Sequence, residues 1–328
     1  MSNKDNQEIG HTSAAAGNAA ANKAGGGKVI AGILIAALAF ATMEAVLKLA
    51  SAGLDNLQLT AVRFFIGGLI LLPFGLAAKK RDNVTLSVKD HLWLLLLGTV
   101  CIPVSMMLFQ VGVVHSNAST ASVLFCINPL FTMVLAHFFA NEPMTKKKGI
   151  AFGISLGGIF MMIRPWDIQE GNTAFGLTLM LLAALTFSIY TIMGKRTLAR
   201  IGNTLQTSLS FLYGAAVLFV IMLFMKRPIL TGLAENWLAV LYIGVVVTGI
   251  GYLAYFKAIE YSDATTGSIT FLIKPAIAPF IAMILLVEHM LWNSYAGLIL
   301  ILAASLLNLF ENRAQHRQAL MEEKRIHS

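Results

Sequence analysis

The chain has 328 residues, of which 57% are hydrophobic and only 12% are charged. A soluble domain carries about 25% charged residues, so this chain lacks the polar surface that water requires, and its mean hydropathy of +0.74 indicates a membrane protein. The net charge of +8 does not indicate a nucleic-acid partner, because the basic residues lie between apolar runs. Cys101 and Cys126 lie inside apolar runs, which favours small hydrophobic residues over a disulfide or a metal site.

The chain begins with residues 1–27, which are rich in Asn, Ala, Gly and Ser, and for which we predict a disordered cytoplasmic tail. The apolar runs that follow are each close to the ~20 residues with which an α-helix crosses a bilayer. Because lipid offers the backbone no hydrogen-bond partner, we predict an all-α integral membrane protein. The ten expected transmembrane helices are residues 29–50, 57–78, 91–114, 119–140, 147–164, 174–194, 204–225, 236–257, 265–287 and 291–310, followed by a basic cytoplasmic tail, 313–328.

The basic residues of the loops are divided unequally between the two sides of the membrane. With a cytoplasmic N-terminus, seventeen Lys and Arg residues face the cytoplasm and only Arg164, Lys226 and Arg227 face outward. Cytoplasmic loops carry the excess of Lys and Arg, so we predict a multi-pass protein of the cell membrane with both termini in the cytoplasm.

The segment from Ser116 to Glu142 has a copy one half-chain later, from Ser262 to Glu288. At a constant offset of 146 residues, nine of 27 positions are identical, where chance gives about two or three. Each half contains five expected helices, an odd number, so the second half enters the membrane from the opposite side. We therefore predict two inverted-topology five-helix repeats, residues 28–165 and 174–312, an arrangement that suits alternating access.

Three motifs connect the chain with a known family. They are Phe40 to Lys48, Ala61 to Phe64, and the Ser/Thr-rich start through Pro129 to Glu142, repeated through Pro275 to Glu288. With these motifs, residues 29–310 resemble the drug/metabolite transporter superfamily, specifically its EamA branch. The resemblance implies a ten-helix secondary transporter, in a family that carries amino acids, other metabolites, drugs and nucleotide sugars. The chain has Phe40 where members of that family often have Trp, and Glu44 where an acid is uncommon. The resemblance therefore does not identify the substrate.

Prolines and glycines interrupt several expected helices at positions that match between the halves. A proline withholds a backbone N–H and frees a carbonyl, which lipid tolerates only where protein or a water-filled cavity receives it. Each interruption alone is also compatible with ordinary helix packing. Together they predict a central cavity lined by the third, fourth, eighth and ninth helices, with the first and sixth contributing. The helix-breaking candidates are Pro103, Pro129, Gly249, Pro275 and Pro279.

Charged residues inside the expected helices are candidate functional residues, because a charge at mid-bilayer costs about 2.5–3.5 kcal/mol. Glu44 and Arg63 both lie about 9 Å below the outer surface, so we expect them to pair, and Glu44 can also pair with Lys48 at i+4. Alternatively, Glu44 is a protonatable coupling site or binds a cationic substrate. Lys274 lies about 14 Å from the inner end, a poor match in depth for a salt bridge with Glu44 unless the helices tilt strongly. Either Lys274 caps carbonyls freed by the prolines, or it binds an anionic group of the substrate with Asn128 opposite.

The sequence therefore predicts a secondary transporter for an anionic or zwitterionic, amino-acid-like solute, with proton coupling as one option. The candidate substrate-binding residues are Lys274, Asn128, Phe40, Phe187, Tyr190, Met106, Tyr252 and Tyr255, and the candidate coupling residues are Glu44 and Arg63. Two alternatives stay open: a membrane-embedded sensor or scaffold that binds a solute without moving it, and a transporter of cationic drugs or amines that uses Glu44. We expect a small-molecule substrate and the lipid bilayer as partners and no nucleic acid, and leave a homodimer open.

One motif suggests an enzyme. Gly153-Ile154-Ser155-Leu156-Gly157 has the G-x-S-x-G pattern of a serine nucleophile, but that chemistry needs a sharp strand-to-helix turn, and this segment lies inside an expected helix. Gly149, Gly153 and Gly157 share one helix face, which instead predicts close packing on a neighbouring helix. We therefore predict no enzymatic activity, no cofactor and no metal.

Overall fold

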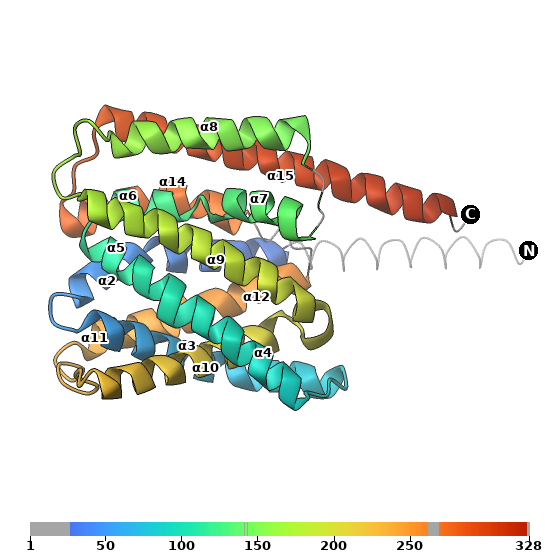
Figure 1. Cartoon of the computed structure of the whole chain (residues 1–328), viewed down its shortest axis with the longest axis horizontal. Coiled ribbons are helices and arrows are strands. Elements are labelled where there is room, and N and C mark those ends of the chain that lie inside the picture. The colour runs from blue at the N-terminus through green and yellow to red at the C-terminus, as the bar shows by residue number, and fades with distance from the viewer. Residues whose placement is uncertain (1–26, 141, 143, 262–268, 327–328) are drawn as a thin grey trace, which may run out of the picture.

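The computed structural model describes residues 27–140, 142, 144–261 and 269–326, and within these ranges the regular elements are all helical (Figure 1). The predicted disordered tail, except for Gly27, lies outside the described residues. In chain order, the elements are a helix over residues 27–41, α2 (Met43–Ala50), α3 (Asn56–Arg81), α4 (Val88–Thr99), the π-helix η1 (Val100–Met106), α5 (Met107–Val114), α6 (Ala118–Phe125), α7 (Asn128–Ala140), α8 (Lys146–Ile163), α9 (Ala174–Ile201), α10 (Asn203–Phe224), α11 (Trp237–Leu241), the π-helix η2 (Tyr242–Gly251), α12 (Tyr252–Glu260), α14 (Thr270–Leu286) and α15 (Trp292–Ile326).

These helices follow the expected apolar runs to within a few residues at most ends. Among the described residues, eight helical stretches are long and apolar enough to cross a bilayer. The two other expected spans correspond to α8 and α14. The apolar helix α14 has 17 residues, whereas α8 has 18 but begins with three lysines, Lys146 to Lys148. The count of ten spans stays a prediction.

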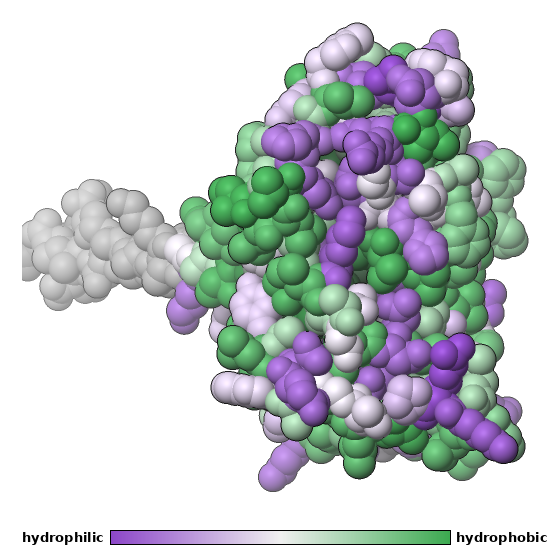
Figure 2. All heavy atoms as spheres, turned by 90° about the vertical axis from the view of Figure 1, so that its left-hand side faces the viewer, coloured by the Kyte–Doolittle hydropathy of each residue, from purple (hydrophilic) through white to green (hydrophobic). Residues whose placement is uncertain are grey.

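The connections between the helices lie at two opposite ends of the bundle (Figure 1). Those after α3, α7 and α9 lie at one end, which we call the inner end because most basic loop residues belong to it. Those after α2, α5, α8 and α10 lie at the other, which we call the outer end. On the outer end, hydrophilic side chains form a band between hydrophobic flanks (Figure 2), the pattern of an end face whose sides contact lipid.

The repeated prolines have different structural effects in the two halves. Pro129 is the second residue of α7 and separates it from α6, whereas Pro275 and Pro279 lie inside the single helix α14. Pro129 has no N–H for the carbonyl of Phe125, four residues earlier. The side-chain amide of Asn128 donates to that carbonyl at 3.0 Å and so replaces the missing hydrogen bond. Asn128 therefore has a structural role at the helix break.

The other repeat-related interruptions lie in the two π-helices. Pro103 belongs to η1, and Gly249, at an offset of 146 residues, belongs to η2. A π-helix bonds each N–H to the carbonyl five residues earlier and widens the helix. The hydroxyl of Thr248 likewise donates to the carbonyl of Ile243, five residues earlier, at 2.9 Å. Both interruptions thus lie in helices of altered geometry.

The helices α8 and α15 form a pair at one edge of the bundle (Figure 1). A Cβ atom on Gly158 would lie 2.9 Å from the carbonyl oxygen of Gly297, so only glycine permits this close approach. The expectation that Gly149, Gly153 and Gly157 pack on a neighbour is wrong for the described residues, since a Cβ on each would meet no atom within 4 Å. α8 packs on α15 through the adjacent face, which contains Gly158.

The last helix extends beyond the expected end of its span. α15 continues to Ile326, whereas the apolar run ends at residue 310. Residues 311–326 contain no Gly or Pro and are rich in Glu, Arg, Gln, Ala and Lys, which favour helix. The predicted tail thus begins as a helical extension of α15.

Candidate functional site

A cavity of about 410 Å³ lies among helices of both halves and reaches the inner end. Its wall is formed by α7 and the start of α8 from the first half and by α9, α10, α12, α14 and α15 from the second. At the mouth, Lys195 pairs with Glu142 at 2.5 Å, and both side chains are 43% exposed. The cavity thus opens on the side that the basic residues predict to be cytoplasmic.

Aromatic rings form one part of the cavity wall. Phe187 and Tyr190 of α9 lie 5.4 Å apart, and Tyr255 packs edge-on against Phe271 at 5.5 Å. Such contacts hold each ring in place and present apolar surface to a solute. Amide and hydroxyl side chains form another part of the wall: Asn128, Thr132, Thr191, Asn203, Gln206, Thr207, Ser305, Asn308 and Asn312. An apolar body with one or more polar groups fits this lining.

The structure brings most predicted substrate-binding residues to this cavity. Those that line it are Asn128, Phe187, Tyr190, Tyr252 and Tyr255, together with the helix-breaking Pro129. Those that do not are Lys274, Phe40 and Met106, together with Pro103, Gly249, Pro275 and Pro279. Phe40 lies directly behind the wall, because its ring contacts Tyr252 at 5.1 Å and Phe271 at 6.3 Å between ring centres.

Lys274 and Glu44 form a buried ion pair. The ammonium of Lys274 lies 2.5 Å from one carboxylate oxygen of Glu44, and the side chains are 2% and 1% exposed. The expectation that Lys274 and Glu44 are poorly matched in depth for a salt bridge is therefore wrong. The same ammonium lies 5.5 Å from the ring centre of Phe125, which contacts the cavity-lining Phe187. The pair is thus separated from the cavity by aromatic side chains.

Arg63 is also buried, but its neighbours are not the expected ones. Its guanidinium donates to the sulfur atoms of Met43 at 3.6 Å and Met106 at 3.8 Å, and lies 4.5 Å from the ring centre of Phe64. No ion pair joins Arg63 to Glu44 among the described residues, so the expected pairing of these two residues is wrong. Sulfur and aromatic faces are weak acceptors, so they only partly compensate for the lost hydration of a buried cation.

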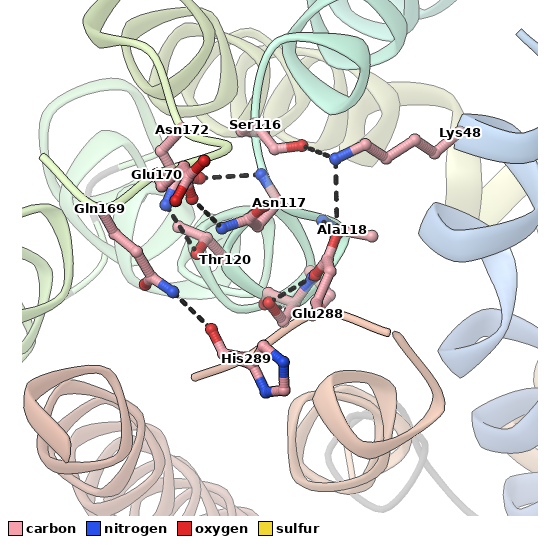
Figure 3. Close-up of polar contacts among 12 residues, drawn as sticks. Lys48, Ser116, Asn117, Ala118, Thr120, Gln169, Glu170, Asn172, Glu288 and His289 are labelled. Carbon is pink, nitrogen blue, oxygen red and sulfur yellow. Dashed lines mark hydrogen bonds and ion pairs between the residues drawn. The ribbon is translucent and has the colours of Figure 1, made fainter. Parts of the chain in front are cut away.

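A second set of polar contacts joins the two halves at the outer end (Figure 3). The carboxylate of Glu288 accepts hydrogen bonds from the backbone N–H groups of Ala118 at 2.7 Å and Ser119 at 3.0 Å, and from the Ser119 hydroxyl at 2.8 Å. Lys48 lies 3.4 Å from the same carboxylate and donates to the carbonyl of Ser116 at 2.6 Å. A carboxylate suits this place, because the first N–H groups of α6 are free and the helix dipole is positive there. The expected pairing of Lys48 with Glu44 is therefore wrong.

Neighbouring loops add further contacts at the same end (Figure 3). The backbone N–H of Asn117 donates to the side chain of Asn172 at 2.8 Å, and its side-chain amide donates to the carbonyl of Glu170 at 2.9 Å. Gln169 donates to the carbonyl of His289. These bonds connect the start of α6 with the loop before α9 and the segment before α15, so several loops of the outer end form one hydrogen-bonded layer.

Several residues of these sites do not follow from the sequence reasoning above. Gln206, Thr207 and Asn308 look like ordinary polar residues of apolar helices, and only the fold shows that they face a cavity. Glu288 does carry a signal, because it ends the repeated segment and matches Glu142. The sequence does not show, however, that its carboxylate reaches α6.

Comparisons with known proteins agree with this architecture. The model of the EamA-like transporter family matches residues 27–164 and, separately, residues 174–310. An uncharacterized transporter of Clostridium kluyveri is 33% identical over 284 residues, which are 84% of this chain and 91% of that protein. The uncharacterized transporter YoaV of Bacillus subtilis is 23% identical over 268 residues, covering 80% of this chain and 90% of YoaV.

Two further proteins are similar to this chain. The protein PagO of Salmonella typhimurium is 24% identical over 251 residues, which are 74% of this chain and 80% of PagO. A protein of known crystal structure superposes with a TM-score of 0.60 at 16% identity, covering 84% of this chain and 97% of that one, which supports the fold alone. Because the family model matches both halves, the chain belongs to the EamA-like transporter family of multi-pass membrane proteins.

Proposed function

We propose that this protein is a secondary transporter that moves a small solute across the membrane by alternating access. The observation that carries the proposal is the contrast between the two ends of the bundle. At the inner end, a cavity lined by both halves is open, whereas at the outer end Lys48 and Glu288 join the halves around the start of α6. A solute from the inner side can therefore enter, while the outer contacts block its exit.

The sequence repeat supports an exchange between two such conformations. Glu142 and Glu288 match at an offset of 146 residues, and Lys48 and Lys195 at 147. The structure pairs Lys48 with Glu288 at the outer end and Lys195 with Glu142 at the inner end. The outer carboxylate is 8% exposed, whereas the inner carboxylate is 43% exposed. We expect the roles of the two pairs to reverse when the cavity opens outward, as inverted repeats allow.

The buried pair of Glu44 and Lys274 is the proposed coupling site. When Glu44 takes up a proton, the Lys274 ammonium loses its carboxylate partner, and it can bind an acidic group of the solute once the aromatic side chains between it and the cavity move aside. This exchange links proton movement to an anionic or zwitterionic substrate. A cationic drug or amine is less favoured, because Lys274 already neutralises the Glu44 carboxylate.

Reconstitution in liposomes tests transport directly. Vesicles are loaded with a mixture of labelled amino acids, carboxylic acids and amines, and the release of each solute under a pH gradient is followed by mass spectrometry. We expect release of an anionic or zwitterionic class. The matched control replaces Lys48 and Glu288 with cysteines joined by a bifunctional thiol reagent, which fixes the outer end closed and stops release. Solutes that stabilise the protein but are retained in the vesicles would support a sensor instead.

A further inference from the structure

The three lysines that begin α8 have different environments. Lys147 is 68% exposed and pairs with Glu311 at 3.2 Å. Lys148 is only 3% exposed, although its side chain contributes to the cavity wall. Its ammonium donates to the side-chain oxygen of Gln315 at 2.8 Å, which is a neutral acceptor. Lys148 is therefore a buried cation whose described hydrogen-bond partner carries no charge.

The carboxylates near the mouth of the cavity already have lysine partners. Glu142 is bound by Lys195 at 2.5 Å, and Glu311 by Lys147 at 3.2 Å. Among the described residues, these three lysines thus share two carboxylates, which leaves an excess of one positive charge. A buried charge is costly unless it is paired, so an anionic group in the cavity would be bound favourably beside Lys148.

One polar atom on the cavity wall has no hydrogen-bond partner among the described residues. Asn308 of α15 is 6% exposed and lines the cavity, and its side-chain oxygen accepts no hydrogen bond from the described residues. Asn308 lies seven residues before Gln315, two turns or about 10 Å along the helix. The unpaired oxygen requires a donor, because a buried acceptor without one costs about 1–3 kcal/mol.

We propose that Lys148 and Asn308 form the recognition site for the polar groups of the transported solute. An acidic group binds the Lys148 ammonium, an N–H or O–H donor faces the Asn308 oxygen, and an apolar body lies against the rings of Phe187 and Tyr190. The substrate class is then a small organic acid or zwitterion. This assignment rests on the proposed transport function and differs from binding at Lys274, whose ammonium is held by Glu44.

The excess charge can be measured without knowing the substrate. In a background with Cys101→Ser and Cys126→Ser, a cysteine replaces the cavity-lining Asn312, and its reaction rates with an anionic (sulfonatoethyl) and a cationic (trimethylammonioethyl) methanethiosulfonate are compared. One unit charge on the wall of the same cavity should change the ratio of the two rates by about fivefold. We expect Lys148→Met to lower the anion-to-cation ratio by this factor. The matched control Lys146→Met removes an exposed lysine outside these ion pairs and should leave the ratio nearly unchanged, since an exposed charge is screened.

A second variant keeps the test decisive if Lys148→Met does not fold. Gln315→Glu retains the lysine but gives it a permanent carboxylate partner, so the rate ratio should fall in the same way. Lys148→Arg keeps the charge and should keep the ratio. An unchanged ratio in Gln315→Glu would overturn the assignment of Lys148.

Binding of probes that share one apolar body tests the chemical class. Thermal stability of the purified protein is measured with millimolar 3-phenylpropionate, phenylalanine or phenethylamine. We expect both carboxylates to stabilise the unmodified protein and Lys146→Met but not Gln315→Glu, and the amine to stabilise none of them. No stabilisation by either carboxylate, or equal stabilisation by the amine, would overturn the site. Binding without flux in liposomes would instead refute transport and leave the site intact.

Discussion

The ammonium of Lys274 lies 2.5 Å from the carboxylate of Glu44, although 230 residues separate the two in the chain. The contact joins α2 of the first half to α14 of the second half, deep inside the protein. Among the described residues, Arg63 has no carboxylate partner and is surrounded by sulfur atoms and aromatic rings. Glu44 thus neutralises Lys274 and not Arg63, and the predictions below begin with this ion pair.

Removal of one partner of the pair should be more damaging than removal of both. Lys274→Met leaves the Glu44 carboxylate buried and unpaired, which should lower the free energy of unfolding by about 3–5 kcal/mol. Glu44→Gln combined with Lys274→Met should recover most of that loss. The measurement is thermal unfolding of the purified variants. Additive losses in the double variant would show that the two side chains do not stabilise each other.

Glu44→Gln should separate transport from the proton gradient. The amide resembles protonated Glu44 but cannot release a proton, so exchange of solute between equal pools should survive while uphill flux driven by the pH gradient disappears. Flux assays in liposomes with and without a pH gradient measure both. Glu260→Gln, which changes an exposed carboxylate paired with Arg81, is the matched control and should remain coupled. A Glu44→Gln protein that still responds to the gradient would make the pair purely structural.

Glu288→Gln should open the outer end more often. The neutral amide loses its charge-assisted bonds to Ala118 and Ser119, each worth about 1.5–3 kcal/mol, so the open population should rise about tenfold or more. The readout is labelling of a cysteine at Thr120, a buried position near these contacts, by an impermeant reagent. Glu142→Gln changes the repeat-related residue at the inner end and should not increase labelling. Equal labelling in both variants contradicts the role of Glu288.

Asn128→Leu should destabilise the break between α6 and α7. The Phe125 carbonyl would lose its donor, at a cost of about 1–3 kcal/mol in the free energy of unfolding. Thermal unfolding detects such a change. Asn312→Leu changes another amide of the cavity wall without affecting this carbonyl and serves as the control. If the two variants melt at the same temperature, the Asn128 amide does not support the break.

The predicted orientation can be checked with exposed positions at the two ends. Cysteines at Ala52 and Pro165 belong to the outer end and should react in intact cells with an impermeant thiol reagent. Cysteines at Asp82 and Lys146 belong to the inner end and should react only after the cells are opened. The excess of basic residues at the inner end is the physical reason. Labelling of Asp82 in intact cells would reverse the orientation.

The helices were predictable because lipid demands long apolar runs. The duplicated segment around Pro129 and Pro275 also pointed to two helices that line the cavity, α7 and α14, and the aromatic candidates Phe187, Tyr190, Tyr252 and Tyr255 do line it. The prediction that the first and third expected helices line the cavity is wrong, because none of the lining residues belongs to them. The apolar runs are a local signal, since they depend on residues that are close together in the chain, whereas the duplication is found by comparing two segments 146 residues apart. The extension of α15 also has a local basis, but the apolar pattern alone placed its end too early.

The ion pairs were not predictable in the same way. Depth counted along ideal helices separated Lys274 from Glu44, because the count assumed helix ends and tilts that only packing determines. Lys48 and Glu288 are 240 residues apart, and no spacing rule connects them. Such contacts form only when distant parts of the chain pack together in the folded protein.

The pairing of α8 with α15 has a consequence for synthesis of the protein in the cell. α8 begins with three lysines and packs through Gly158 on Gly297, and Asn293 donates to the carbonyl of Met161 at 2.9 Å. The ribosome makes α8 long before α15, so the nascent α8 enters the membrane without this partner and waits for the final helix. A chain that stops before Trp292 would leave α8 permanently unpaired, and quality-control proteases should remove it. Completion of synthesis is therefore also the moment at which this edge of the bundle becomes stable.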